Sequence, residues 1–149
     1  MSNNSKLEKF ITAIHSTAKA IARSNLQEKK EKFEKISKPK ILSPENQEEI
    51  LEARVLSDSD ALKIKYSDEY ILNKNQPSGT ISRSLYQVAE KIRYEALGFK
   101  MLSGIKKNIK NNYIQIIKSK RKSQLQKKED VTISEAFELY MLKNFHNIE

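Results

Sequence analysis

At residues 86–104 the chain reads YQVAEKIRYEALGFKMLSG, and this segment carries the strongest helical pattern in the sequence. Apolar residues recur at helical spacing along it and just before it, at Leu85, Val88, Ala89, Ile92 and Ala96. The pattern predicts a long central helix that starts near Thr80. Glu90, Arg93 and Glu95 are crowded into six residues of the same helix.

The composition favours helices over strands. Of 149 residues, 38% are apolar and 32% are charged, which suits one domain with a thin core and a large charged surface. Three glycines and three prolines leave few residues that would break a helix. We therefore expect an all-α fold over residues 1–149, a compact bundle of four to six helices with a basic helical extension.

Helix-start signals divide the rest of the chain. Ser5 to Glu8 and Thr132 to Glu135 match capping boxes, which predict helices over about 6–23 and from 132 to about 144. Ser43-Pro44 predicts another helix start. A run of Ser and Asp at 57–60 predicts a new cap that restarts this helix. We expect connectors at 24–43 and 73–79, and a basic, mobile segment at 118–131.

Sequence motifs for catalysis are missing. The chain has no cysteine, no GxxxxGK[ST] phosphate loop, no GxGxxG and no HExxH. His15 and His146 stand alone, and a lone histidine is more often structural or solvated than a metal ligand. We therefore expect no metal and no catalytic residue. No signal peptide or membrane-spanning run is present, so the expected location is cytoplasmic and away from membranes.

The positive charge is concentrated in one segment. Nine of the 28 basic residues and no acidic ones lie between Lys106 and Lys128, and the other 19 balance the 19 acidic residues. The core of this basic patch is Lys106, Lys107, Lys110, Lys118, Lys120, Arg121 and Lys122. It can be a solvated face, a dock for an acidic partner or a nucleic-acid site. Nucleic acid is the less favoured partner, because Tyr113 is the only aromatic residue there to stack on bases.

The charged residues of the central helix have two readings. Arg83 and Glu90 return to one helix face, and Arg93 lies within reach of Glu90. They form either a docking surface for a partner or an anionic ligand, or a structural ion-pair network, and the structural reading is favoured. Downstream, we expect Gly98, Met101 and Gly104 to be structural, with close packing at the glycines and the methionine filling a gap in the core.

A longer ordered set of residues resembles a known family. The set is Pro77, Gly79, Ser82, Arg83, Leu85, Tyr86, Glu90, Arg93, Glu95, Ala96, Gly98, Met101, Gly104 and Asn108. Its order and spacing resemble the N-terminal region of the CobT subunit of aerobic cobaltochelatase. Asp68 also matches the family pattern. Ser67 and Leu72 stand where relatives have histidines, and Ser82 stands where they have alanine.

The resemblance implies a role in cobalamin biosynthesis. The family belongs to an ATP-dependent complex that inserts Co²⁺ into hydrogenobyrinic acid a,c-diamide. The complex would use ATP, Mg²⁺ and Co²⁺, none of them bound by this chain. Its partners would be the AAA+ ATPase subunit and the large corrin-binding subunit. The von Willebrand-type metal-site domain of the family is absent from this sequence. We expect no catalysis from this chain alone, and an adaptor role instead.

The resemblance implies candidate partner- or ligand-binding residues, and one alternative stays open. The candidates are Arg83, Glu90, Arg93, Glu95 and Asp68. The alternative function is a basic helical binding protein derived from this family, which would bind nucleic acid or an acidic protein partner.

Overall fold

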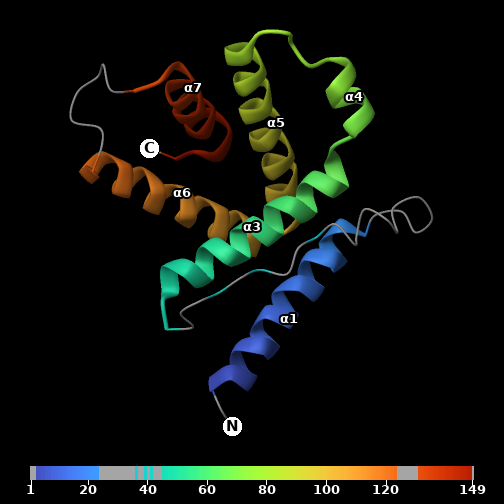
Figure 1. Cartoon of the computed structure of the whole chain (residues 1–149), viewed down its shortest axis with the longest axis vertical. Coiled ribbons are helices and arrows are strands. Elements are labelled where there is room, and N and C mark those ends of the chain that lie inside the picture. Colours follow the sequence, from blue (N-terminus) through green and yellow to red (C-terminus); the bar gives the residue numbers. More distant parts are fainter. Residues whose placement is uncertain are drawn as a thin grey trace. The chain divides into compact units, whose positions relative to one another are not determined.

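The computed structural model describes residues 3–23, 36, 39, 41, 45–123 and 131–148, with the side chains of 3, 4 and 121–123 excepted. Every regular element in these ranges is helical, with six α-helices followed by one π-helix (Figure 1). The all-α expectation is confirmed. The chain divides into two compact units, Met1–Tyr66 and Ser67–Glu149, which are described separately. The predicted connector at 24–43 lies almost entirely outside the described residues, as does the segment 124–130.

The first unit is a pair of helices, α1 (Asn3–Ala22) and α3 (Gln47–Tyr66), that pack against each other. The apolar cluster of this unit is centred on Ile14 of α1, Ala53 of α3 and Ile41, which precedes α3. Partly buried side chains surround this centre, at Leu7, Phe10, Ile11 and Ile50. The apolar residues of α1 follow helical spacing and form one face, and α3 supplies the facing surface.

The starts of α1 and α3 differ from the sequence prediction. Ser5 and Glu8 lie inside α1, which already begins at Asn3, so the predicted capping box is wrong. The helix α3 begins after Asn46, whose Oδ1 accepts hydrogen bonds from the amides of Glu48 and Glu49. Ser43 and Pro44 lie outside the described residues.

The predicted new cap at residues 57–60 is also wrong, because α3 runs through it without a break. The Ser57 hydroxyl donates to the Ala53 carbonyl at 3.1 Å, four residues back in the same helix. The Asp58 carboxylate lies 4.0 Å from the Arg54 guanidinium. These contacts within the helix accommodate residues that would otherwise favour a helix start.

The second unit is built around α5 (Thr80–Met101). It begins with the short α4 (Glu69–Lys74) and continues after α5 with α6 (Ser103–Ser123), α7 (Ile133–Met141) and the π-helix η2 (Leu142–His146). The helix α5 contacts α6, α7 and η2 (Figure 1). It is therefore the central helix of this unit, as its apolar pattern predicted.

The core of the second unit follows helical spacing on each element. Buried apolar residues are Ile92 and Tyr94 on α5, Ile105, Ile109 and Tyr113 on α6, and Leu142 and Ile148 near the C-terminal end. The four-residue spacing on α6 places its buried residues on one stripe. One stripe of α6 is thus apolar although the helix carries most of the basic patch.

The start of α7 and the end of α6 can be compared with the sequence predictions. The capping box of Thr132 and Glu135 is confirmed at the start of α7. The helix α6 extends to Ser123, six residues into the segment that we predicted to be mobile. The C-terminal turn widens into η2 and ends at Asn147, whose left-handed backbone (φ 52°) asparagine tolerates well.

Candidate functional site

Glu90 and Arg93 form a two-pronged ion pair on α5. The Arg93 Nε donates to Glu90 Oε2 at 2.6 Å, and Nη2 donates to Oε1 at 2.7 Å. The Ser67 hydroxyl donates to the same Oε1 at 2.5 Å. The hydrogen bonds to Glu90 raise the pKa of Arg93 above its ordinary value. Because two parallel bonds fix the plane of a guanidinium, the Arg93 side chain is oriented although it is 47% exposed.

Glu95 lies on the buried side of the same helix, in a cluster of three polar side chains. Its side chain is 1% exposed, and its Oε2 accepts hydrogen bonds from the Tyr113 hydroxyl and from His146 Nε2, both at 3.0 Å. Since a carboxylate can only accept, the hydrogen lies on Nε2 of the imidazole. The Phe99 ring packs on the His146 ring with centroids 4.3 Å apart. We call Glu95, Tyr113 and His146 the buried polar cluster.

The buried polar cluster joins three elements that are distant in sequence. Glu95 comes from α5, Tyr113 from α6 and His146 from the end of η2. Tyr113 also lies beneath the Lys91 ammonium, which is 5.2 Å from the ring centroid. A buried charged group persists only when it is paired and hydrogen-bonded. The cluster therefore fixes how the C-terminal turn packs on α5 and α6.

Tyr113 should resist ionisation in the folded protein. Burial, followed by the neighbouring Glu95 carboxylate, raises the pKa of Tyr113 well above the ordinary value of 10. The unfolded chain ionises this tyrosine near pH ~10, whereas the native state keeps it neutral, so stability should fall as the pH rises above that value. In an ultraviolet titration of the native protein, Tyr113→Phe should leave the tyrosinate signal near pH ~10 unchanged. Loss of one tyrosine's worth of signal there would contradict the assignment.

A cavity of about 760 Å³ opens beside the buried polar cluster. One face of α5, the start of α6 and the C-terminal turn form its walls. The lining residues are Ala89, Arg93, Ala96, Leu97, Phe99, Lys100, Lys106, Met141, Asn144, Phe145, His146 and Asn147. Three of them are cations and none is acidic. We call this space the cationic pocket, and it can hold an apolar group with a negative charge.

Two of the predicted binding residues have simple structural surroundings. Asp68 is the N-cap of α4, and its Oδ1 accepts hydrogen bonds from the amides of Tyr70 and Ile71. Arg83 is exposed on the first turn of α5, and its side chain makes no hydrogen bond or ion pair with the described residues. The structure thus brings Glu90 and Arg93 together, but it does not link Arg83 to Glu90.

The other predicted residues divide between core and surface. Glu95 is fully buried, so its side chain is not on the face that presents Arg83 and Arg93. Gly98 is buried, and α5 continues through it to Met101. Met101 is 40% exposed at the helix end, which differs from the expected core filling. An added Cβ at Gly104 would meet open space, so close packing is not required at that glycine.

The basic patch is partly used within the second unit. Lys110 Nζ donates to the Asn147 carbonyl at 3.0 Å, and Lys120 Nζ lies 3.0 Å from Glu135 Oε1. Lys106, Lys107 and Lys118 are exposed, and the side chains of Arg121 and Lys122 lie outside the described residues. Two of its lysines therefore tie α6 to the C-terminal segment.

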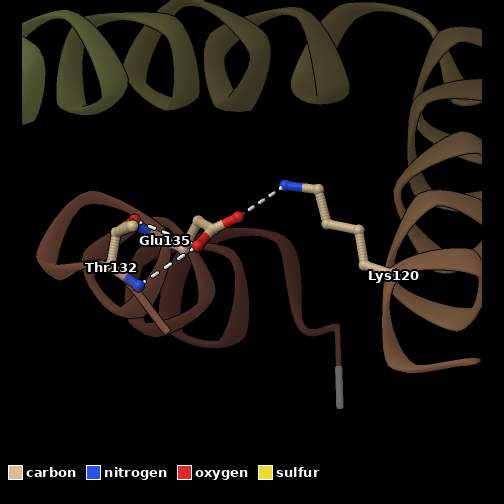
Figure 2. A network of polar contacts seen from close by, with 3 residues as sticks. All are labelled: Lys120, Thr132 and Glu135. Carbon is tan, nitrogen blue, oxygen red and sulfur yellow. Dashed lines mark hydrogen bonds and ion pairs between the residues drawn. The ribbon is translucent and has the colours of Figure 1, made fainter. Parts of the chain in front are cut away.

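Lys120 approaches the start of α7 through Glu135 (Figure 2). Glu135 Oε2 also accepts from the Thr132 amide and hydroxyl, while its own amide donates to Thr132 Oγ1. The Lys120 hydrogen bond, and then those from Thr132, lower the pKa of Glu135 below its ordinary value. Its contribution to stability is thus present at neutral pH and is lost as the pH falls through the folded-state pKa.

The described residues contain no obvious metal centre. No group of three or more His, Asp or Glu side chains lies close enough together there to hold an ion. None of the described helices is both long and apolar enough to cross a membrane. The site is accordingly a surface ion pair, a buried polar cluster and a cationic pocket, all carried by the second unit.

The described residues form an all-α protein, with its charged and polar candidate residues carried mainly by α5. Residues 4–144 match the family model described as cobalamin biosynthesis protein CobT. The chain belongs to the CobT family, and the resemblance drawn from residues 77–108 is confirmed. Comparison with curated proteins and with solved structures finds no match.

His146 and Tyr113 were not predicted as partners of Glu95. We predicted that the last helix ends near residue 144, but helical structure continues through His146, which is 1% exposed within η2. One available signal was its spacing of four residues from Leu142 and seven from Leu139, which extends the apolar stripe of the last helix. Tyr113 similarly continues the stripe of Ile105 and Ile109 on α6.

Proposed function

We propose that this chain is a non-ATPase adaptor domain of a CobT-type cobaltochelatase subunit. In this role it docks on the AAA+ ATPase subunit or on the large corrin-binding subunit during ATP-dependent Co²⁺ insertion into hydrogenobyrinic acid a,c-diamide. The family match over residues 4–144 is the observation that carries the proposal. An adaptor needs neither a nucleotide site nor a metal site of its own, since its partners supply the chemistry.

The exposed charged face of α5 supports docking there. Arg83 stands free of side-chain partners among the described residues, and Arg93 is half-exposed while Glu90 holds its guanidinium plane. A held side chain loses little conformational entropy when a partner binds. Cations of this kind steer and orient an acidic partner surface more than they add raw affinity. We therefore assign Arg83 and Arg93 to the docking surface.

Charge reversal at Arg83 should weaken binding to a chelatase subunit. We expect Arg83→Glu to raise the dissociation constant about tenfold, because a favourable charge contact becomes a repulsive one. The Arg93→Glu variant should raise the dissociation constant more than Arg83→Glu does. Its new carboxylate would lie beside Glu90, so two negative charges would replace an ion pair. Biolayer interferometry against each purified subunit measures the effect. An equal affinity of all variants would rule out this face of α5.

Lys63→Glu provides a matched control for this experiment. Lys63 is exposed on α3, in the first unit, and the substitution changes the charge by the same amount. Its affinity should equal that of the wild type. Melting temperatures of all variants separate a loss of docking from a loss of folding, and binding of the wild type to neither subunit would overturn the proposal.

A further inference from the structure

We infer that the cationic pocket binds a small amphipathic organic anion, with an apolar ring body and a carboxylate or similar acidic group. The pocket lies in the second unit alone, and its volume of about 760 Å³ is within the range of small-molecule sites. This inference goes beyond the adaptor role, because it concerns a ligand of this chain and requires neither chelatase subunit.

The charge of the pocket favours an anion. Lys100 and Lys106 line it, and neither side chain makes a hydrogen bond or ion pair with another described residue. Arg93 also lines it, but Glu90 already balances that charge. The two lysines therefore leave unbalanced positive charge at the wall, and a carboxylate within reach of both would be held by charge-assisted hydrogen bonds.

The walls of the pocket favour an apolar ring body. One face of α5 contributes Ala96 and Leu97, and the C-terminal turn contributes Met141 and Phe145. Phe145 is 55% exposed, although aromatic side chains usually bury much of their surface. A ring inserted here would cover Phe145 while its acidic group stayed at the lysines. Small alanine side chains on α5 leave the space that such a ring needs.

His146 gives a second, independent reason for a ligand at this wall. Its side chain is fully buried and lines the pocket, and its Nδ1 has no hydrogen-bond partner among the described residues. Buried polar atoms are nearly always paired, so an unpaired one calls for a missing partner. Because Nε2 is engaged by Glu95, Nδ1 is the ring nitrogen left for a ligand. A hydroxyl or amide of the ligand could satisfy it after a small ring movement.

The test uses the anionic fluorophore 8-anilino-1-naphthalenesulfonate and its neutral relative N-phenyl-1-naphthylamine with the whole chain. We expect the anionic probe to bind at one site, to be displaced by 2-naphthoate and to weaken with salt. The double variant Lys100→Glu/Lys106→Glu should weaken the anionic probe about tenfold while it leaves the neutral probe nearly unchanged. Phe145→Ala should weaken both probes.

Lys107→Glu is the matched control, because Lys107 is exposed beside Lys106 but does not line the pocket. Its affinity for the anionic probe should stay within about twofold of the wild type. If Lys107→Glu weakened the probe as much as the double variant, binding would reflect the charge of α6 and the inference would fail. No saturable binding by the wild type, or an unchanged affinity of the double variant, would also overturn it. Should the double variant melt early, Lys100→Gln/Lys106→Gln tests the same lysines without introducing negative charge.

Discussion

Replacing Glu95 by alanine is expected to lower the free energy of unfolding by about 3–5 kcal/mol. The substitution removes the acceptor that the Tyr113 hydroxyl and His146 Nε2 share, and both donors would remain buried. A buried donor without a partner costs about 1–3 kcal/mol, and the missing side chain also leaves a cavity. Chemical denaturation monitored by circular dichroism measures the loss.

Two further variants show whether the hydrogen bonds are the cause. Glu95→Gln keeps an oxygen that can accept from both donors, so it should cost clearly less than alanine. Glu52→Ala on α3 removes an exposed carboxylate and should change the free energy of unfolding by less than about 0.5 kcal/mol. If Glu95→Ala were as mild as Glu52→Ala, the buried polar cluster would not stabilise the fold.

Truncation of Leu142 to alanine should have the second-largest effect, a loss of about 2–5 kcal/mol. Leu142 is 2% exposed at the start of η2. It lies one turn before His146 and lines a cavity of about 250 Å³ together with Tyr113 and Leu139. The shortened side chain would enlarge this existing space, and its neighbours would lose their packing contacts.

Tyr140→Ala is the control for the Leu142 variant. Tyr140 precedes Leu142 by two residues but is 63% exposed, so its truncation should cost less than about 1 kcal/mol. Thermal or denaturant unfolding of the two variants in parallel distinguishes a buried turn from a frayed end. Equal, small effects would mean that the C-terminal turn does not pack on the second unit.

The sequence predicted the central helix α5 and the start of α7 because their signals are local. The apolar stripe around Ile92 gave the central helix, and Thr132 with Glu135 gave a capping box that closes through bonds within four residues. The pairing of Glu90 with Arg93 followed from a spacing of three. Each of these depends on neighbours along the helix, which a sequence displays directly.

Features that depend on distant residues were harder to predict. The partners of Glu95 lie 18 and 51 residues away, so spacing along one helix gave no sign of them. At residues 57–60, cap-forming side chains lie in the middle of a helix, since packing outweighs local propensity. The cationic pocket likewise combines three elements. Tertiary packing, rather than local pattern, determines the site.

The adaptor role is tested most directly by mixing the purified wild-type chain with the AAA+ subunit and with the large corrin-binding subunit, separately and together. Sedimentation velocity then reports whether a complex forms. The proposal predicts a saturable complex with at least one subunit, weakened by Arg83→Glu but not by Lys63→Glu. It also predicts no ATP hydrolysis by the chain alone. Independent sedimentation of the chain in every mixture would contradict the adaptor role.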